Sequence, residues 1–141
     1  LEVAEPLIMG DRFGQQNGYL ETKRLLESEP RPTAILAMSG LVTVEALRAL
    51  HDHDVSVPEE ISIVGFDELP YPDLLANPVT TVRQPIGEMA RMAVDLLLAQ
   101  IDQPRTSPEK PMRVQLPCEL VQRQTVRVLP LSPLSPEAPP Q

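Results

Sequence analysis

The sequence predicts an α/β fold in which a parallel sheet is flanked by helices, and three observations support it. Short apolar runs bounded by proline, glycine or aspartate alternate with longer segments whose apolar residues recur at helical spacing. These runs are continuously apolar, as is typical of strands in a parallel sheet that is covered on both faces. The order strand–helix–strand–helix–strand favours the right-handed crossovers that parallel strands require.

The first half of the chain has the clearest alternation. Residues 3–9 are predicted to form a strand, although Pro6 is unusual there, and residues 17–28 are predicted to form a helix. The apolar run at 33–38 follows two prolines and predicts a buried strand. Segment 41–53 is predicted to be an amphipathic helix, because its apolar residues recur at i, i+4, i+7 and i+8.

The rhythm changes after the next strand, which is predicted at 60–66. A proline-rich loop at 69–79 leads to a short strand at 80–83. Residues 85–101 form the clearest helix of the sequence, with a continuous apolar stripe, and begin at a proline, which the first turn of a helix tolerates. Segment 113–122 is predicted to contain one or two final strands.

Composition excludes several classes of protein. The 141 residues carry 12 Lys and Arg against 20 Asp and Glu, a net charge of -8, so this segment is a poor candidate for binding nucleic acid. One cysteine excludes a disulfide framework and suits a reducing, cytoplasmic setting. No apolar run is long enough to span a membrane, and residues 1–20 do not resemble a signal peptide. The proline-rich stretch 127–141 predicts a disordered tail.

Candidate binding residues follow the predicted strands, because ligands of open parallel sheets bind beyond the carboxyl ends of the strands. Phe13 lies in the loop after the first predicted strand and offers a ring for stacking. Ser39 and Gly40 stand where a helix begins and presents free N–H groups, and Asp67 follows the run SIVGF. The alternative interpretation is that these are solvated loop residues and that Ser39 is a helix N-cap.

No arrangement of residues predicts an enzyme, a metal site or a cofactor. His51 and His53 are two positions apart, whereas a helical metal site needs a spacing of three or four, so both are expected to be solvated. Cys118 lies in an apolar run with no histidine nearby, which favours a buried, unreactive thiol. We therefore expect no catalytic residues, no metal ligands and no cofactor.

Several longer motifs resemble the C-terminal part of the effector-binding domain of LacI/GalR-family transcription regulators. They are PRPTAILAMSG at 30–40, VEALRAL at 44–50, VPEEISIVGFDE at 57–68, NPVTTVRQPIGEMARMAVDLLL at 77–98 and VQLPCELVQRQT at 114–125. VPEEISIVGFDE followed by TTVRQP is a highly specific combination. RFGQQNGY at 12–19 is similar to the segment that leads into the preceding helix.

The resemblance implies a periplasmic-binding-protein-like fold of type I, in which two α/β subdomains close over a small metabolite such as a sugar. It implies that residues 1–126 are a partial effector-binding domain, with the C-terminal subdomain at 1–82 and 112–125. Helix 85–101 would belong to the N-terminal subdomain, and operator DNA would be bound by a helix-turn-helix outside the chain. Without that subdomain, we expect the apolar stripe of the helix to be buried between molecules, by swapping or in a new dimer.

The resemblance also implies site residues. Asp67 matches an aspartate that commonly binds the effector, and Phe13 matches an aromatic residue that often stacks on it. Relatives usually have Asn-Asp where this chain has Ser39-Gly40, so two strong polar contacts to a sugar would be missing. A homodimer is implied, and the residues expected at its interface are Leu41, Val42, Leu47, Leu69, Tyr71 and Leu74. The alternative for these side chains is packing within their own subdomain.

Two other functions remain to be compared with an effector-sensing, dimerising part of a regulator. A sugar-binding component of an ABC-type transporter shares the fold, although the wording of VPEEISIVGFDE and TTVRQP favours a regulator. An enzyme is the third possibility, and no nucleophile–base pair supports it. No membrane association is expected for this chain.

Overall fold

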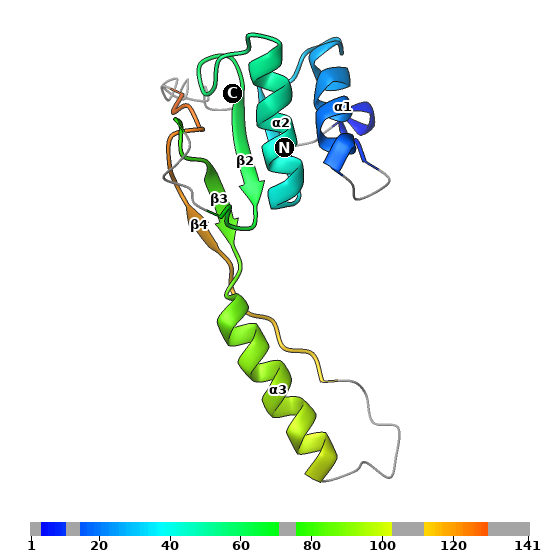
Figure 1. Ribbon diagram of the computed structural model, residues 1–141, viewed down its shortest axis with the longest axis vertical. Coiled ribbons are helices and arrows are strands. Elements are labelled where there is room, and N and C mark those ends of the chain that lie inside the picture. The colour runs from blue at the N-terminus through cyan, green and yellow to red at the C-terminus, as the bar shows by residue number, and fades with distance from the viewer. Residues whose placement is uncertain (1–3, 11–14, 71–75, 103–111, 130–141) are drawn as a thin grey trace, which may run out of the picture.

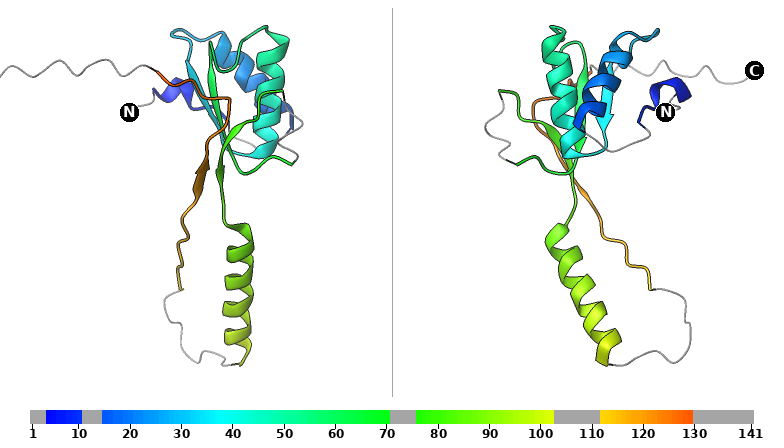
Figure 2. Two further views of the ribbon diagram at one scale, coloured as in Figure 1. Left: turned by 90° about the vertical axis from the view of Figure 1, so that its left-hand side faces the viewer. Right: turned by 45° about the vertical axis from the view of Figure 1, so that its right-hand side comes forward.

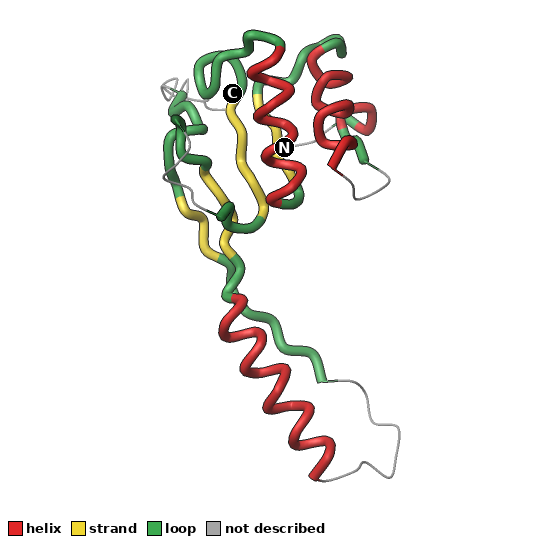
Figure 3. Tube along the Cα trace, in the orientation of Figure 1, coloured by secondary structure: helices red, strands yellow, loops and turns green. Residues whose placement is uncertain are grey.

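The computed structural model describes residues 4–10, 15–70, 76–102 and 112–129. Two helices lie beside a four-stranded sheet, and a third helix extends away from them (Figures 1 and 3). The elements are a short 3-10 helix at Glu5–Leu7, α1 (Gln15–Leu26), β1 (Ala34–Ala37), α2 (Gly40–Asp52), β2 (Ser62–Phe66), β3 (Thr80–Arg83), α3 (Ile86–Asp102) and β4 (Glu119–Val121). No helix in these ranges is long and apolar enough to cross a membrane.

The sheet has the order β1-β2-β3-β4, and its first three strands are parallel. Ile35 pairs with Ile63, and Gly65 pairs with Thr81, which confirms the crossovers predicted from the alternating pattern. The last strand makes the sheet a mixed one, because β4 runs antiparallel to β3. The chain leaves the sheet through β3, forms α3 and then returns alongside β3, so its last strand points the opposite way.

The described helices cover only one face of the sheet. Along β1 the side chains alternate, with Ile35 and Ala37 buried and Leu36 60% exposed. Met38, just after the strand, is 57% exposed. The prediction that both faces are covered is therefore wrong for the described residues, and the continuous apolar run of β1 leaves one set of side chains in solvent.

The core lies between α2 and the covered face of β1 and β2, and α1 packs on α2. Close approach of the backbones makes this possible at two glycines. A Cβ at Gly65 would lie 2.8 Å from the hydroxyl oxygen of Thr43 on α2, and one at Gly18 would lie 3.0 Å from the Val42 carbonyl oxygen. The buried core residues are Ile35, Ala46, Leu50, Ile61 and Ile63.

The returning segment after β4 is fastened to the sheet by Thr125, which is fully buried. Its hydroxyl donates to the carbonyl oxygen of Ile63 at 2.7 Å and accepts from the Thr80 N–H at 2.9 Å. The Ile63 N–H in turn donates to the Thr125 carbonyl oxygen at 2.8 Å. One residue thus connects β2, β3 and the end of the returning segment.

Helix α3 projects beyond the carboxyl ends of the strands in all three views (Figures 1 and 2). It shares no extensive packing with the other helices and strands, so its apolar stripe, predicted from the sequence, lies in solvent. Burial of each such side chain would contribute about 1.5–3 kcal/mol. The exposed side chains are Ile86, Met89, Val94, Leu97, Leu98 and Ile101.

Most predicted helices and strands are confirmed, and one is not. The strand expected at 3–9 is wrong, because Glu5–Leu7 form a 3-10 turn with Pro6 in its first residues, and the Leu7 N–H donates to the Ala4 carbonyl oxygen at 2.9 Å. Segment 113–122, predicted to contain one or two strands, contains one, β4 at Glu119–Val121. The proposed tail lies mostly outside the described residues, so its disorder stays a prediction.

Replacement of Gly65 by alanine should destabilise the protein by about 1–3 kcal/mol, because the new methyl group would overlap Thr43. Urea denaturation followed by circular dichroism measures this change in the free energy of unfolding. Gly87→Ala is the matched control. An added Cβ there has no neighbour within 4 Å, so this helical glycine should tolerate alanine or gain stability. Equal stability of the two variants would contradict the close packing of α2 on β2.

Candidate functional site

The carboxyl edge of the sheet collects the turns that follow β1, β2 and β3. Because these strands are parallel, Ser39, Asp67 and Gln84 all leave the sheet on the same side. The arrowheads of β2 and β3 point toward α3 in Figure 1, so this edge faces the space beside that helix. The sequence-based placement of Ser39, Gly40 and Asp67 at one edge is thus confirmed.

Ser39 and Gly40 are used to build the start of α2. The Ser39 hydroxyl accepts the Val42 N–H at 3.2 Å, and its carbonyl oxygen accepts the Thr43 N–H at 2.9 Å. A Cβ at Gly40 would lie 3.3 Å from the Leu69 side chain. Ser39 is therefore a helix N-cap, as the alternative interpretation of the sequence had it, and Gly40 allows Leu69 to pack closely.

Asp67 is the most distinctive residue of the edge. Its backbone has a φ of 75°, a left-handed conformation that is uncommon outside glycine but tolerated by aspartate. Its N–H donates to the Val82 carbonyl oxygen at 3.0 Å, and its Oδ1 accepts the Gln84 side-chain amide at 2.5 Å. Such a strained and partly exposed position is typical of ligand-binding sites, and it holds the carboxylate at the edge.

Sequence reasoning did not single out Gln84 as a site residue. The available signal was its position directly after a strand parallel to β2 and directly before Pro85, which places it at the same edge as Asp67. Glutamine is common on surfaces, and its type gave no reason to choose it. Only the register of β2 and β3 brings its amide to the Asp67 carboxylate.

Glu68, next to Asp67, is the centre of a charged network below the edge. Its two carboxylate oxygens accept from Arg123 at 2.6 Å and from Arg83 at 2.7 Å. Burial by itself would raise the pKa of Glu68, but the hydrogen bonds and charges of Arg83 and Arg123 outweigh it and lower that pKa below its ordinary value of 4.5. This network joins the turn after β2 to β3 and to the returning segment.

The residues expected at a dimer interface differ in their exposure. Leu41 is 45% exposed on α2, whereas Val42 and Leu47 are half-buried, and Leu47 packs against the core. Leu69 is only 4% exposed, so the expectation that its side chain is available to a partner is wrong. It packs against Gly40 at the start of α2. Phe13, Tyr71 and Leu74 lie outside the described residues.

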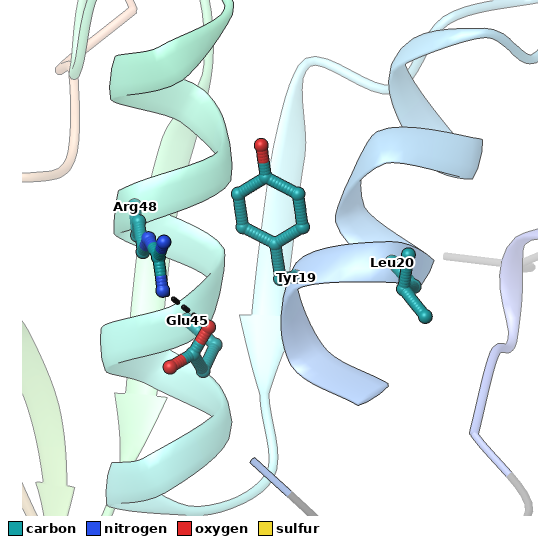
Figure 4. A pocket seen from close by; sticks show the side chains of 4 residues that line it. All are labelled: Tyr19, Leu20, Glu45 and Arg48. Carbon is teal, nitrogen blue, oxygen red and sulfur yellow. Dashed lines mark ion pairs between the residues drawn. The ribbon is translucent and has the colours of Figure 1, made fainter. Parts of the chain in front are cut away.

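A hollow of about 260 Å³ lies between α1 and α2, away from the carboxyl edge (Figure 4). The Arg48 guanidinium lies 5.5 Å from the centre of the Tyr19 ring and pairs loosely with Glu45 at 4.0 Å. The Tyr19 hydroxyl donates to Asp52, at the end of α2 opposite Ser39. This hollow is open and separate from the residues that the sequence marked for binding, so we do not assign the site to it. Leu20 completes its lining.

Metal-binding and nucleophilic chemistry find no support in the described residues. His51 and His53 are both exposed, as expected, and the His53 Nδ1 lies 2.9 Å from the Ala49 carbonyl oxygen. Cys118 is exposed, so its predicted burial is wrong, because the chain before β4 is not covered by another layer. No group of three or more potential metal ligands occurs within the described ranges.

Known proteins resemble this chain over most of its length. The periplasmic binding protein-like domain profile matches residues 1–126. The ribose operon repressor of Halalkalibacterium halodurans is 33% identical over 126 residues, which is 89% of this chain and 37% of that protein. The transcriptional repressor PurR of Glaesserella parasuis is 30% identical over 132 residues, which is 92% of the chain and 39% of that protein.

Solved structures show a similar fold. The transcriptional regulator CelR in complex with cellobiose matches with a TM-score of 0.78 and 30% identity, over 89% of this chain and 37% of that one. A LacI family regulator from Lactobacillus casei with bound sucrose matches with a TM-score of 0.71 and 30% identity, over 89% and 46% of the two chains. The chain thus spans less than half the length of the relatives it matches.

The lowered pKa of Glu68 predicts a pH dependence of stability. A carboxylate whose pKa is lower in the folded protein than in the unfolded chain stabilises the folded protein at a pH above its ordinary pKa of 4.5. This contribution to stability is lost as the pH falls below 4.5 and passes the lowered pKa of Glu68. Glu68→Gln should therefore unfold at a lower temperature than the wild type near pH 7, and the difference should shrink toward pH 3. Thermal melts across this range measure it. A difference that stays constant with pH would show that the charge of Glu68 does not contribute.

Proposed function

The chain belongs to the LacI family of transcription regulators, and on that basis we propose that it forms the effector-sensing and dimerising part of such a regulator. The observation that carries the proposal is the carboxyl edge of the sheet, where Asp67 directly follows β2 and is held in a left-handed conformation. A small metabolite bound there would lie between the sheet and the subdomain to which α3 belongs.

We divide the effector-binding domain accordingly. The sheet with α1 and α2 forms one subdomain, which includes residues up to 82 and the returning segment to 125. Helix α3 is assigned to the other subdomain, because its apolar stripe is exposed and it shares no extensive packing with the sheet. The two connecting segments, after β3 and before β4, are then the places where one subdomain moves relative to the other.

A sugar is the proposed class of effector. A carboxylate accepts hydrogen bonds from sugar hydroxyl groups, and related regulators have been solved with bound sucrose, ribose and cellobiose. Ser39 already caps α2 and Gly40 has no side chain, so Asp67 is the principal polar group that this edge offers among the described residues. Phe13 is proposed to stack on the ligand from the loop before α1.

The regulator is favoured over the other functions. The relatives described above are repressors and regulators, which supports this assignment over a sugar-binding component of an ABC-type transporter, and none of them is named as an enzyme. A net charge of -8 disfavours contact of this segment with DNA, so operator binding is assigned to a helix-turn-helix part of the regulator. Such a protein acts where the chromosome lies, which in bacteria is the cytoplasm.

We also propose a homodimer formed through α2. Leu41 and Val44 are 45% and 47% exposed on the outer side of this helix, and Val42 and Leu47 border them. The stripe on α3 is the second apolar surface through which copies of this chain would associate. Isologous pairing of one surface in a twofold dimer is the commonest arrangement of soluble oligomers.

Asp67→Asn should weaken sugar binding about 10- to 100-fold, because a hydrogen bond to a charged group contributes about 1.5–3 kcal/mol. The full chain is titrated with ribose, glucose, sucrose and cellobiose by calorimetry. Asp54→Asn is the matched control, because Asp54 also has a left-handed backbone, with a φ of 54°, but follows the opposite end of α2. Equal binding of a sugar by the Asp67→Asn variant and the wild type would remove Asp67 from the site.

The α2 interface predicts that the double change Leu41→Lys and Val44→Lys converts dimers to monomers, because two buried ammonium groups would face each other across a twofold axis. Sedimentation velocity measures the distribution. Val128→Lys is the control, since Val128 is 79% exposed and lies far along the chain from α2. Dissociation by Leu97→Lys in place of the α2 pair would instead assign the dimer to α3, and a wild type that is monomeric at high concentration would exclude both surfaces.

A further inference from the structure

Asp67 and the start of α3 are connected through a single side chain, that of Gln84. We propose that Gln84 is a positioning residue that ties the Asp67 carboxylate to α3, so that the hydrogen bonding of Asp67 and the direction of this helix depend on each other. This coupling goes beyond effector binding itself, because it assigns a role to a residue that need not touch the ligand.

The first observation is how Asp67 is held. Its N–H is bonded to Val82, and its Oδ1 accepts the Gln84 amide at 2.5 Å, so both contacts come from the strand that continues into α3. No donor to Oδ2 occurs among the described residues, so this oxygen can accept from a ligand. The left-handed backbone restricts where the carboxylate points, and the Gln84 amide restricts its rotation.

The second observation is how Gln84 meets α3. Pro85 follows directly and restricts the backbone of Gln84 to extended conformations. The Gln84 carbonyl oxygen accepts the Ile86 N–H at 2.9 Å, and the Pro85 carbonyl accepts the Met89 N–H at 2.9 Å as the helix begins. A continuous series of bonds therefore leads from the Asp67 carboxylate to the first turn of α3.

The third observation is that little else fixes the helix to the sheet in the described part of the chain. Helix α3 has no extensive packing with α1, α2 or the strands. Arg83 is paired with Glu68 and Glu119, and those contacts fasten β3 to β4 below the point where the helix starts. The orientation of α3 thus depends strongly on the bond between Gln84 and Asp67.

The consequence for regulation rests on the proposed function. A ligand hydroxyl that bonds to the Asp67 carboxylate would change the strength or geometry of the bond to Gln84, and the start of α3 would respond. The bond between Asp67 and α3 does not itself require a ligand. It can therefore be tested in the absence of any sugar, and failure of sugar binding would leave that test intact.

The experiment measures the distance distribution between spin labels on α2 and α3 by pulsed electron resonance. Labels are placed at His51→Cys and Gln100→Cys, which are exposed, with Cys118→Ser removing the native thiol. Labelled protein is diluted with unlabelled protein so that only distances within one molecule contribute. Gln84→Ala and Asp67→Ala are each expected to broaden the distribution, and the double variant is expected to broaden it no further.

The controls separate positioning from a general loss of structure. Gln122→Ala removes an exposed glutamine that directly follows β4, beside the start of β3 and away from Gln84, and should leave the distribution unchanged. Gln84→Lys should keep it narrow while Asp67 is present, since an ammonium group can pair with the carboxylate, and should broaden it in the Asp67→Ala background. No broadening in Gln84→Ala, or additive broadening in the double variant, would overturn the proposal. If Asp67→Ala does not fold, Asp67→Gly, which suits the left-handed backbone, replaces it.

Discussion

The buried hydroxyl of Thr125 is the contact on which the arrangement of the molecule depends. It bridges Ile63 on β2 and Thr80 on β3. Thr125 lies 45 positions after Thr80, so this contact fastens to the sheet the segment that returns after α3. Because the chain is held on both sides of α3, β3 and β4 pair as antiparallel neighbours at the base of this helix. Arg123 strengthens the same junction by bonding to Glu68 and to the Val79 carbonyl oxygen. These contacts therefore hold both connections between the sheet and α3 in place.

The polar side chains at the carboxyl edge all stabilise the fold. They differ in how far they remain available to bind a ligand. Ser39 caps α2 with its hydroxyl, and Glu68 is fully engaged by two arginines, so neither is free to bind a ligand without a cost to the fold. Asp67 differs from both. Its left-handed backbone is held by the hydrogen bond to Val82, while one of its carboxylate oxygens has no donor among the described residues. The function proposed for this chain therefore rests on one carboxylate and on the strands that present it.

Local patterns were sufficient to predict the helices and most strands. The stripe of α3, the spacing in α2 and the apolar run of β2 each depend on residues that are neighbours in sequence, and the structure places these elements where they were expected. Predictions of burial were less successful. Leu69 was expected to be exposed and is buried against Gly40, while Cys118 was expected to be buried and is exposed. Each outcome depends on a segment distant in the sequence, or on a layer that does not cover the strand.

The sequence by itself determined the class of fold, the family, and the position of Asp67 at the end of a buried strand, because alternation, turn residues and long motifs are properties of consecutive residues. Only the tertiary structure decided that Ser39 is committed to a cap and that Gln84 reaches Asp67. The latter contact joins residues 17 positions apart, through the register of two parallel strands. That register is set by the packing of α2 and by the returning segment, neither of which can be read from the residues around Asp67.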